Sequence, residues 1–231
     1  SADGHSRRTN ALGYKLIDKY LKPMKSASLV SAATSATPVS VYQGDHVTEL
    51  DLRRVDANYW KILDFKLLAG RLPTLEDEQQ GRLVAVVNES VAQQLYPAGA
   101  AVGKPLDLGG QAFRVIGVVE DAPAHLHAYS EIWAPVTSFP TSAYKDSLSG
   151  PFVALLLADS AADLPRMQRE VQQIARAVVP TDEGMAVAQF WADSKLDDLA
   201  RGILSNYENQ ESGARTLIAI IATTMLLFML L

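Results

Sequence analysis

The order of apolar and polar residues predicts short strands along most of the chain, with a few helices between them. Short apolar or alternating stretches bounded by Pro, Gly or Asp predict strands. They cover residues 28–32, 39–42, 47–55, 65–68, 83–87, 105–108, 111–119, 131–136, 152–158 and 185–190. Apolar residues at every third or fourth position predict helices over 9–21, 57–63, 89–95 and 163–178, and a further helix from Ser194 onward. This mixture predicts an α+β fold.

Local signals make the middle of the chain a candidate folding unit. Asn88 is placed to cap the helix 89–95, and Gly109-Gly110 separates two predicted strands by the two residues of a tight hairpin. Residues 50–122 are therefore expected to form a β-rich unit of their own. The flanking residues 27–48 and 129–191 are expected to pack together, because their β-prone stretches lack local partners.

The C-terminal pattern predicts a membrane helix that is cut before its end. Residues 216–231 contain no charge, Pro or Gly, and Thr223 and Thr224 are the only polar side chains after Thr216. These 16 residues span about 24 Å as a helix, short of the roughly 30 Å hydrocarbon core. The alternative, a buried core helix, normally shows a polar stripe. We expect one continuous helix from Ser194 to Leu231 that acts as a lever, with Gly202 and Gly213 as its weak points.

Composition and charge exclude several classes of protein. The net charge of −5 and the pI near 5.4 do not provide the basic field that nucleic acids require. The absence of Cys excludes disulfide scaffolds and thiolate metal clusters. Residues 1–25 carry +4 and the rest −9, so the leading segment suits anionic lipid headgroups, although a solvated helix face explains the charge equally well. No signal-peptide pattern is visible, so we expect a mature form or a piece of a longer chain.

Two motifs resemble enzyme sites but lack their partners. Ser142-Ala-Tyr-Lys145 matches the S-x-x-K pattern of penicillin-recognising serine enzymes, whereas their S-D-N and K-T-G motifs are absent. Residues 99–105 resemble a phosphate loop, but one residue between the glycines is missing. Pro105 replaces the Ser or Thr that would hold magnesium. The sequence therefore predicts neither a serine nucleophile nor a nucleotide site.

The remaining polar and aromatic candidates have simpler explanations. His125 and His127 have no further ligands at metal-binding spacing, so a surface loop is favoured. The carboxylates at 76–78, 120–121 and 182–183 fall in predicted turns, where they are expected to be solvated. The three tryptophans, Trp60, Trp133 and Trp191, are expected in the core. The sequence thus predicts no catalytic, cofactor-binding or metal-binding residue, leaves the substrate-binding residues unknown, and indicates that the chain is not an enzyme.

An ordered set of short motifs resembles one known family. The motifs are Val55-Asp-Ala-Asn-Tyr-Trp60, Leu68-Ala-Gly-Arg71, Val86-Val-Asn-Glu-Ser90, Ala101-Val-Gly-Lys104 and Phe113-Arg-Val-Ile-Gly-Val-Val119. In this order and spacing the chain resembles the periplasmic core domain of MacB-like, FtsX-family ABC transporter permeases. The resemblance extends through Trp133-Ala-Pro135 to Gly213-Ala-Arg215. Each motif by itself is weak, and the specificity comes from the ordered set.

The resemblance implies a two-lobed domain. A porter-like α/β lobe would be split between residues 26–49 and 123–192, with a sabre-like β-rich lobe at 50–122 inserted in it. Residues 1–25 would form a helix that follows a missing transmembrane helix. Residues 193–231 would form a stalk helix that runs into the truncated transmembrane helix.

The resemblance also implies a function in transport across the bacterial inner membrane, with this domain on the periplasmic side. Such a domain couples cytoplasmic ATP hydrolysis to periplasmic motion that exports or extrudes a substrate. The implied partners are a cytoplasmic ABC ATPase, a second permease copy in a homodimer or heterodimer, the membrane, and an adaptor or outer-membrane channel in some members. The alternative is a membrane-anchored extracytoplasmic binding or sensor module. A membrane-tethered hydrolase would need a convergent polar site, which the motifs do not supply.

Overall fold

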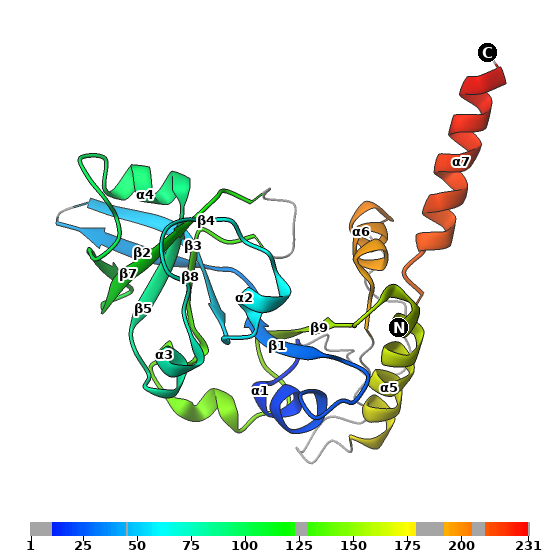
Figure 1. The fold of residues 1–231 in the computed structure, drawn as a ribbon, viewed down its shortest axis with the longest axis horizontal. Helices are drawn as coiled ribbons and strands as arrows, with labels where there is room; N and C mark the ends of the chain where they lie inside the picture. Colours follow the sequence, from blue (N-terminus) through cyan, green and yellow to red (C-terminus); the bar gives the residue numbers. More distant parts are fainter. Residues whose placement is uncertain (1–10, 45, 123–128, 179–191, 205–210, 231) are drawn as a thin grey trace, which may run out of the picture. The chain divides into compact units, whose positions relative to one another are not determined.

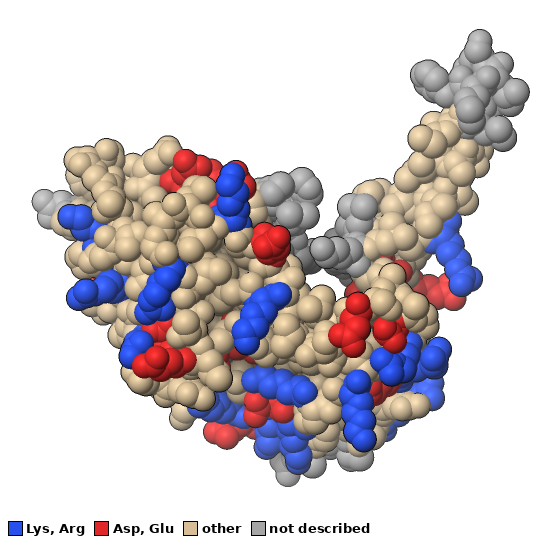
Figure 2. Space-filling view, in the orientation of Figure 1, with Lys and Arg blue, Asp and Glu red and all other residues tan. Residues whose placement is uncertain are grey.

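The computed structural model describes residues 11–44, 46–122, 129–178, 192–204 and 211–230, and it confirms the α+β class (Figure 1). The chain divides into two compact units, Ser1–Leu157 and Ala158–Leu231. On the face drawn in Figure 2, basic and acidic side chains are interspersed over the described residues.

The first unit contains all the described strands. They are β1 (Leu29–Thr34), β2 (Thr37–Gln43), β3 (His46–Val55), β4 (Leu67–Gly70), β5 (Val84–Asn88), β6 (Pro105–Leu108), β7 (Gln111–Val119), β8 (Ile132–Pro135) and β9 (Phe152–Leu157). The helical segments are α1 (Tyr14–Leu16), the π-helical turn η1 (Ile17–Leu21), α2 (Tyr59–Ile62), α3 (Leu75–Gln79), α4 (Glu89–Leu95) and the 3₁₀ turns η2 (Val136–Ser138) and η3 (Ser142–Lys145). The predicted strands match within a few residues. The strand predicted over 185–190 lies outside the described residues.

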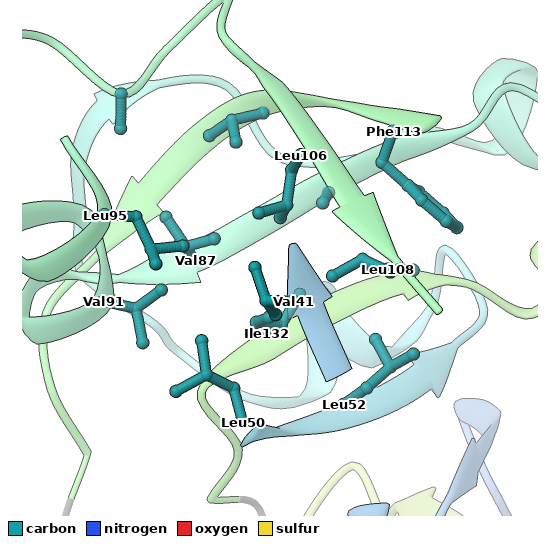
Figure 3. Packing of buried hydrophobic residues seen from close by; sticks show 14 of the residues in the cluster. Val41, Leu50, Leu52, Val87, Val91, Leu95, Leu106, Leu108, Phe113 and Ile132 are labelled. Atoms are coloured by element: carbon teal, nitrogen blue, oxygen red, sulfur yellow. The ribbon is translucent and has the colours of Figure 1, made fainter. Parts of the chain in front are cut away.

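The strands form one sheet, and six of the strands close into a ring. Strands β2, β6, β7, β5, β8 and β3 are neighbours in that order, and β2 also pairs with β3, so these strands make a closed ring. The side chains of Val41, Leu50, Leu106 and Ile132 meet inside this ring (Figure 3). Helix α4 adds Val91 and other apolar side chains to the same cluster. Burying each such side chain stabilises the fold by about 1.5–3 kcal/mol.

A second core lies where β1 and α2 meet the ring. Strand β1 pairs with the end of β3 and, along its whole length, with β9. Tyr59, Trp60, Trp133 and Val86 are buried together in this cluster. The prediction that Trp60 and Trp133 are core residues is confirmed. Trp191 lies outside the described residues.

The strand pairing groups the residues differently from the predicted lobes. Strand β2 belongs to the segment 26–49, which was assigned to the porter-like lobe, yet it pairs along its length with β3 and also with β6. Strand β8, from the segment 123–192, pairs with β3 and β5. The proposed boundary near residue 50 falls inside β3. Strands β2 and β3 form one hairpin, so both belong to the ring and a boundary at residue 50 would divide that hairpin.

The second unit is helical in its described residues. It contains the 3₁₀ turn η4 (Ala161–Asp163), α5 (Leu164–Ala177), α6 (Lys195–Leu204) and α7 (Ala214–Leu230). Helix α5 buries Met167, Val171 and Ala175, which share one face at a spacing of four residues. The helix predicted over 163–178 is therefore present.

The prediction of one continuous helix from Ser194 to Leu231 is wrong. Helix α6 is described up to Leu204, and α7 begins at Ala214. Residues 211–213 before α7 are not helical, and Gly213 has a left-handed φ of +82°. The Ser212 hydroxyl donates to the Asp197 carboxylate at 2.5 Å, which ties the connection back to α6. Among the described residues, none of the helices combines the length and the apolar composition that crossing a bilayer requires.

Candidate functional site: the Lys22 junction

The S-x-x-K motif does not form a nucleophile and base pair. Ser142 and Lys145 lie on the short turn η3, and both side chains are exposed. Among the described residues no hydrogen bond joins the two side chains, whereas an activated serine needs a base within hydrogen-bond reach. The structure thus gives Ser142 no catalytic geometry.

The segment that resembles a phosphate loop is a turn that leads into a strand. Lys104 N donates to the Ala101 carbonyl at 3.0 Å, and Gly103 N donates to the Val115 carbonyl at 2.7 Å. A phosphate cradle needs free N–H groups at a helix N-terminus, whereas here these donors are engaged and β6 follows. His125, His127 and the carboxylates at 182–183 lie outside the described residues. Within the described residues no group of three or more His, Cys, Asp or Glu is placed to hold a metal ion.

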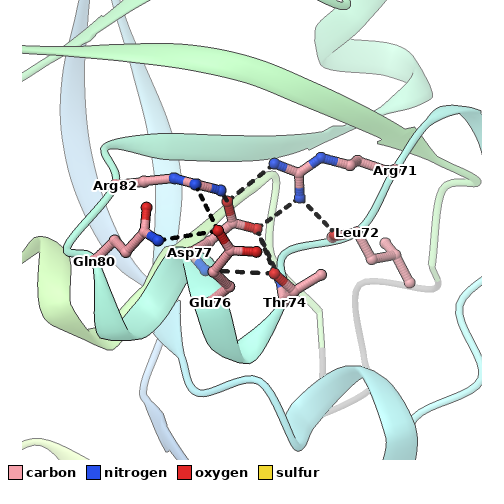
Figure 4. Close-up of polar contacts among 7 residues, drawn as sticks. All are labelled: Arg71, Leu72, Thr74, Glu76, Asp77, Gln80 and Arg82. Atoms are coloured by element: carbon pink, nitrogen blue, oxygen red, sulfur yellow. Dashed lines mark hydrogen bonds and ion pairs between the residues drawn. The ribbon is translucent and has the colours of Figure 1, made fainter.

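The predicted turn carboxylates include one that is fully buried. Asp77 lies on α3, a helix that the sequence reading missed, and its side chain has no solvent exposure. It forms ion pairs with Arg71 at 2.6 Å and Arg82 at 3.0 Å, and it forms a capping box with Thr74 (Figure 4). The Arg71 hydrogen bond, supported by Thr74 and Arg82, outweighs burial and holds the pKa of Asp77 well below its usual range. The prediction that Asp77 is simply solvated is wrong.

The other predicted turn carboxylates have local structural roles. Glu120 forms an exposed ion pair with Lys66 at 3.1 Å. Asp121 accepts hydrogen bonds from the N–H of Ser90 at 3.1 Å and from its hydroxyl at 2.5 Å, at the start of α4. These contacts place neither carboxylate beside a catalytic partner.

The described residues of the leading segment begin with backbone contacts to residues 148–152, near the end of the first unit's sequence. Leu12 and Phe152 exchange two backbone hydrogen bonds of 2.9 Å, and Gly13 N donates to the Leu148 carbonyl at 2.8 Å. A side-chain carbon on Gly13 would overlap the Ser147 carbonyl oxygen. Residues 11–13 therefore lie in close backbone contact with residues 147–152.

Lys22 holds the next turn of the leading segment against the sheet. Its ammonium lies 3.0 Å from Asp18, 3.3 Å from the Tyr14 hydroxyl and 3.8 Å from the carboxylate of Asp56. It also lies 5.1 Å from the centre of the Tyr14 ring. Burial disfavours the ammonium, but Tyr14, Asp18 and Asp56 outweigh it and raise the pKa of Lys22.

Asp56 connects this ammonium to two elements of the core. Its buried carboxylate accepts hydrogen bonds from the Ser31 hydroxyl at 2.7 Å and Ala32 N at 2.9 Å, both on β1. It also accepts from Tyr59 N at 3.3 Å, at the start of α2. A carboxylate fixed by three donors gives Lys22 a rigid partner.

Glu78 and Tyr144 complete the junction. Glu78 Oε2 accepts from Ala57 N at 2.9 Å, and burial raises the pKa of Glu78. The ring of Tyr144 packs edge-to-face on Tyr14 at 5.2 Å, and burial raises the pKa of Tyr144 to about 12. We call Tyr14, Lys22, Asp56, Glu78 and Tyr144 the Lys22 junction.

The junction is suited to mechanical connection rather than to chemistry. None of its five residues is a serine or cysteine. Lys22 already contacts Asp56 and Tyr14, and Glu78 accepts from the backbone N–H of Ala57. The Asp56 carboxylate is buried whereas Lys22 is partly exposed, so removing Lys22 is expected to cost about 1–3 kcal/mol. The contact therefore strengthens the connection between the two segments. Sequence reasoning missed the junction. Its one local signal is Asp18, four residues before Lys22.

Comparisons with known proteins point to one family. The sequence model of the MacB-like periplasmic core domain matches residues 3–174. An uncharacterized ABC transporter permease of Bacillus subtilis, YknZ, is 23% identical over 186 residues, covering 80% of this chain and 44% of that protein. The macrolide export ATP-binding/permease protein MacB of Aggregatibacter actinomycetemcomitans is 32% identical over 92 residues, covering 40% of this chain and 14% of that protein.

Solved structures have the same fold. The extracellular domain of the noncanonic ABC-type transporter YknZ from Gram-positive bacteria matches with a TM-score of 0.62 at 20% identity, covering 79% of this chain and 90% of that chain. The periplasmic region of MacB from Actinobacillus actinomycetemcomitans matches with a TM-score of 0.63 at 18% identity, covering 90% of this chain and 89% of that chain. The solved structures are themselves domains, whereas the curated relatives are longer proteins. The matched part of this chain spans 14% to 44% of the length of those relatives.

Proposed function

The chain belongs to the family of MacB-like periplasmic core domains, and from this membership we propose that it is the extracytoplasmic domain of an ABC transporter permease subunit. The domain receives motion that cytoplasmic ATP hydrolysis generates and passes it to a substrate on the periplasmic side, for export or extrusion. Its partners are an ABC ATPase and a second permease copy. The chain itself supplies no hydrolytic chemistry.

The observation that carries this proposal, beside the family match, is the Lys22 junction. A domain that passes on motion needs a stiff connection between the segment that moves and the rest of the fold. The leading segment contacts the first residue of β9 through Leu12 and contacts β1 through Lys22 and Asp56. Displacement of residues 11–22 would therefore displace β1 and β9 together.

Hydrogen exchange in the full-length permease with its ATPase tests the proposal without knowledge of the substrate. Amide exchange is measured for residues 11–34 in the presence of ATP and of ADP, with an ATPase variant that binds ATP without hydrolysing it as a further arm. We expect nucleotide-dependent exchange in the leading segment and in β1. A domain whose exchange is the same in every nucleotide state does not receive motion from the ATPase. That result would favour the binding or sensor module.

Two matched lysine variants separate the junction from general charge effects. In Lys22→Met the nucleotide-dependent change is expected to persist in residues 11–22 and to weaken in β1, because the link through Asp56 is lost while the link through Leu12 and β9 remains. In Lys19→Met it is expected to remain in both, because Lys19 is exposed and lies over the neighbouring Tyr20 ring. Equal responses in the two variants would remove Lys22 from the mechanism.

A further inference from the structure

A second feature of the first unit is independent of the Lys22 junction's ion pairs. Arg54, on β3, is half-buried, and its guanidinium carbon lies 4.5 Å from the centre of the Phe139 ring. The Phe139 ring packs against two other aromatic rings, with its centre 4.8 Å from that of Tyr144 and 5.9 Å from that of Phe152. The backbone of Arg54 is also fixed, because its N–H donates to the Thr34 hydroxyl at 2.9 Å. The guanidinium is thus held in place on an aromatic surface.

This cation has no anionic partner within the part of the chain that the structure describes. Its Nε is buried and has no hydrogen-bond acceptor, and no described carboxylate lies within ion-pair distance. Burial lowers the pKa of Arg54, with no compensating charge. Arg71 and Arg82, in contrast, share the carboxylate of Asp77. The Nε–H of Arg54 is thus shielded from water without an acceptor, which is costly to the folded state.

Two further donors without partners lie in the turn before Phe139. The hydroxyl oxygens of Thr137 and Ser138 are buried and make no hydrogen bond. Ser138 is 1% exposed. Both residues follow β8 directly, and β8 places Ala134 beside Arg54 and Pro135 beside Val55 in the parallel pairing with β3. The turn η2 contacts β3. The turn that carries both hydroxyls therefore lies beside the part of β3 that carries Arg54.

We propose that Arg54, Thr137 and Ser138 form a binding site for a small oxyanion, a carboxylate or a phosphate group. The planar guanidinium offers two parallel donors to such a group, and the Phe139 ring below leaves the guanidinium edge as its direction of approach. The serine and threonine hydroxyls add donors to the same group. Buried water would satisfy the hydroxyls equally, but it would leave the half-buried guanidinium without a countercharge. This proposal does not rest on the proposed transmission of motion, although the Phe139 ring packs on Tyr144 of the Lys22 junction.

Thermal unfolding of the purified chain in inorganic phosphate and in acetate tests the site, with chloride used to keep the ionic strength constant. A ligand that binds only the folded state raises the unfolding temperature in a saturable manner. At ten times the dissociation constant the expected rise is about 3–6 °C for a chain of this size. Stabilisation by phosphate only, by acetate only or by both identifies which oxyanion the site accepts. No saturable rise with either anion up to about 50 mM would mean that water fills the site, and it would overturn the proposal.

Two arginine variants locate the effect. In Arg54→Gln the anion-dependent rise is expected to vanish. In Arg114→Gln it is expected to remain, because Arg114 is exposed on the outer face of β7. Without added anion, Arg54→Gln is expected to unfold at the same temperature as the parent or above it, since it removes an unpaired desolvated charge. An equal anion response in Arg54→Gln and the parent would overturn the assignment.

A measurement on the unmodified chain keeps the test independent of folding of the variants. The Nε–H resonance of Arg54 in proton–nitrogen spectra is expected to shift with increasing phosphate or acetate along the same saturation curve. The Nε–H resonance of Arg114 is expected to stay in place. A resonance of Arg54 that does not respond to either anion contradicts the proposed site.

Discussion

The guanidinium of Arg71 binds the buried carboxylate of Asp77 through both of its terminal nitrogens, Nη1 to Oδ2 at 2.6 Å and Nη2 to Oδ1 at 2.9 Å (Figure 4). The same carboxylate accepts from the backbone N–H of Thr74 at 2.9 Å and from Arg82 at 3.0 Å. Arg71 follows β4, and Arg82 precedes β5. One carboxylate thus fixes the whole connection between these two strands.

Replacing Asp77 by Asn is expected to cost about 3–5 kcal/mol of unfolding free energy. The change removes the charge that both arginines share and weakens the capping box of α3. Urea unfolding at pH 7 measures it. The control is Glu76→Gln, because Glu76 pairs with Arg82 at the surface and an exposed pair contributes about 1 kcal/mol or less. If both variants lose the same unfolding free energy, the buried position of Asp77 does not make its ion pairs more stabilising than the exposed pair of Glu76.

The same carboxylate is expected to make stability depend on pH in the acid range. The pKa of Asp77 is lowered in the folded state, mainly by Arg71, so its contribution is present above its unfolded pKa of about 3.9 and is lost as pH falls below it. Glu78 acts in the opposite sense, because its raised pKa favours proton uptake by the folded state. Between pH 5 and pH 3 we expect urea midpoints to fall more steeply for the parent than for Asp77→Asn. Parallel slopes would contradict the assignment.

Two glycines with similar backbone angles provide a test of packing between β4 and β7. Gly70 has φ +73°, and a side-chain carbon there would overlap the Ile116 carbonyl oxygen. Gly81 has φ +60° and open space around it. Gly81→Ala is expected to cost about 1–2 kcal/mol, the penalty of the left-handed conformation. Gly70→Ala is expected to cost about 3 kcal/mol or more, since overlap adds to that penalty. Urea unfolding of both variants gives the difference, and equal costs would refute the close approach.

Much of the local structure was predictable because its causes are local. The Gly109-Gly110 turn places Leu108 opposite Gln111, as the two-residue spacing indicates. The Asn88 cap also forms as predicted, with its side chain accepting from Val91 N at 2.9 Å. Helix α3 was missed because its acidic residues were read as a solvated turn. The signal was present in Thr74 and Asp77, three residues apart, which form the capping box.

The junction and the ring of strands were not predictable, because their partners are distant in the sequence. Lys22 and Asp56 are 34 residues apart, and nothing local in either segment indicates the other. Val41 on β2 pairs with Leu108 on β6, and this pairing likewise joins segments that are distant in the sequence. Gly213 was recognised as a weak point of the C-terminal helix, yet the break also needs Ser212 to reach Asp197 on α6. Such contacts follow from the assembled fold rather than from residue order.

Lys22→Met is expected to destabilise the isolated chain by about 1–3 kcal/mol. The variant keeps the apolar stem of the side chain but leaves the buried Asp56 carboxylate without its cation. Faster amide exchange is expected in α1 and η1, while the core of the ring stays protected. Lys19→Met, at an exposed position, should change the unfolding free energy by no more than about 0.5 kcal/mol. If the two lysine variants behave alike, Lys22 does not anchor the leading segment.

The break between α6 and α7 gives the last prediction. Ser212 donates to Asp197 Oδ1, whereas the other oxygen of Asp197 accepts from the N–H of Ser194 at 2.9 Å and from its hydroxyl at 2.7 Å, at the start of α6. The two serines thus use different oxygens of one carboxylate and can be removed separately. Ser212→Ala should release the start of α7 from α6 while leaving the α6 cap in place.

Amide exchange distinguishes the two effects. The N–H of Leu217 bonds the Gly213 carbonyl at 3.0 Å. Ser212→Ala is expected to speed exchange at Leu217 by about tenfold or more, since a hydrogen bond to a charged group contributes about 1.5–3 kcal/mol. Ser194→Ala is expected to speed exchange in the first turn of α6 and to leave Leu217 unchanged. The cap that Ser194→Ala removes contributes about 1 kcal/mol. If Ser212→Ala leaves Leu217 as protected as in the parent, the hydroxyl does not hold the two helices together. Gly213 and the apolar contacts of α7 would then have to explain the break.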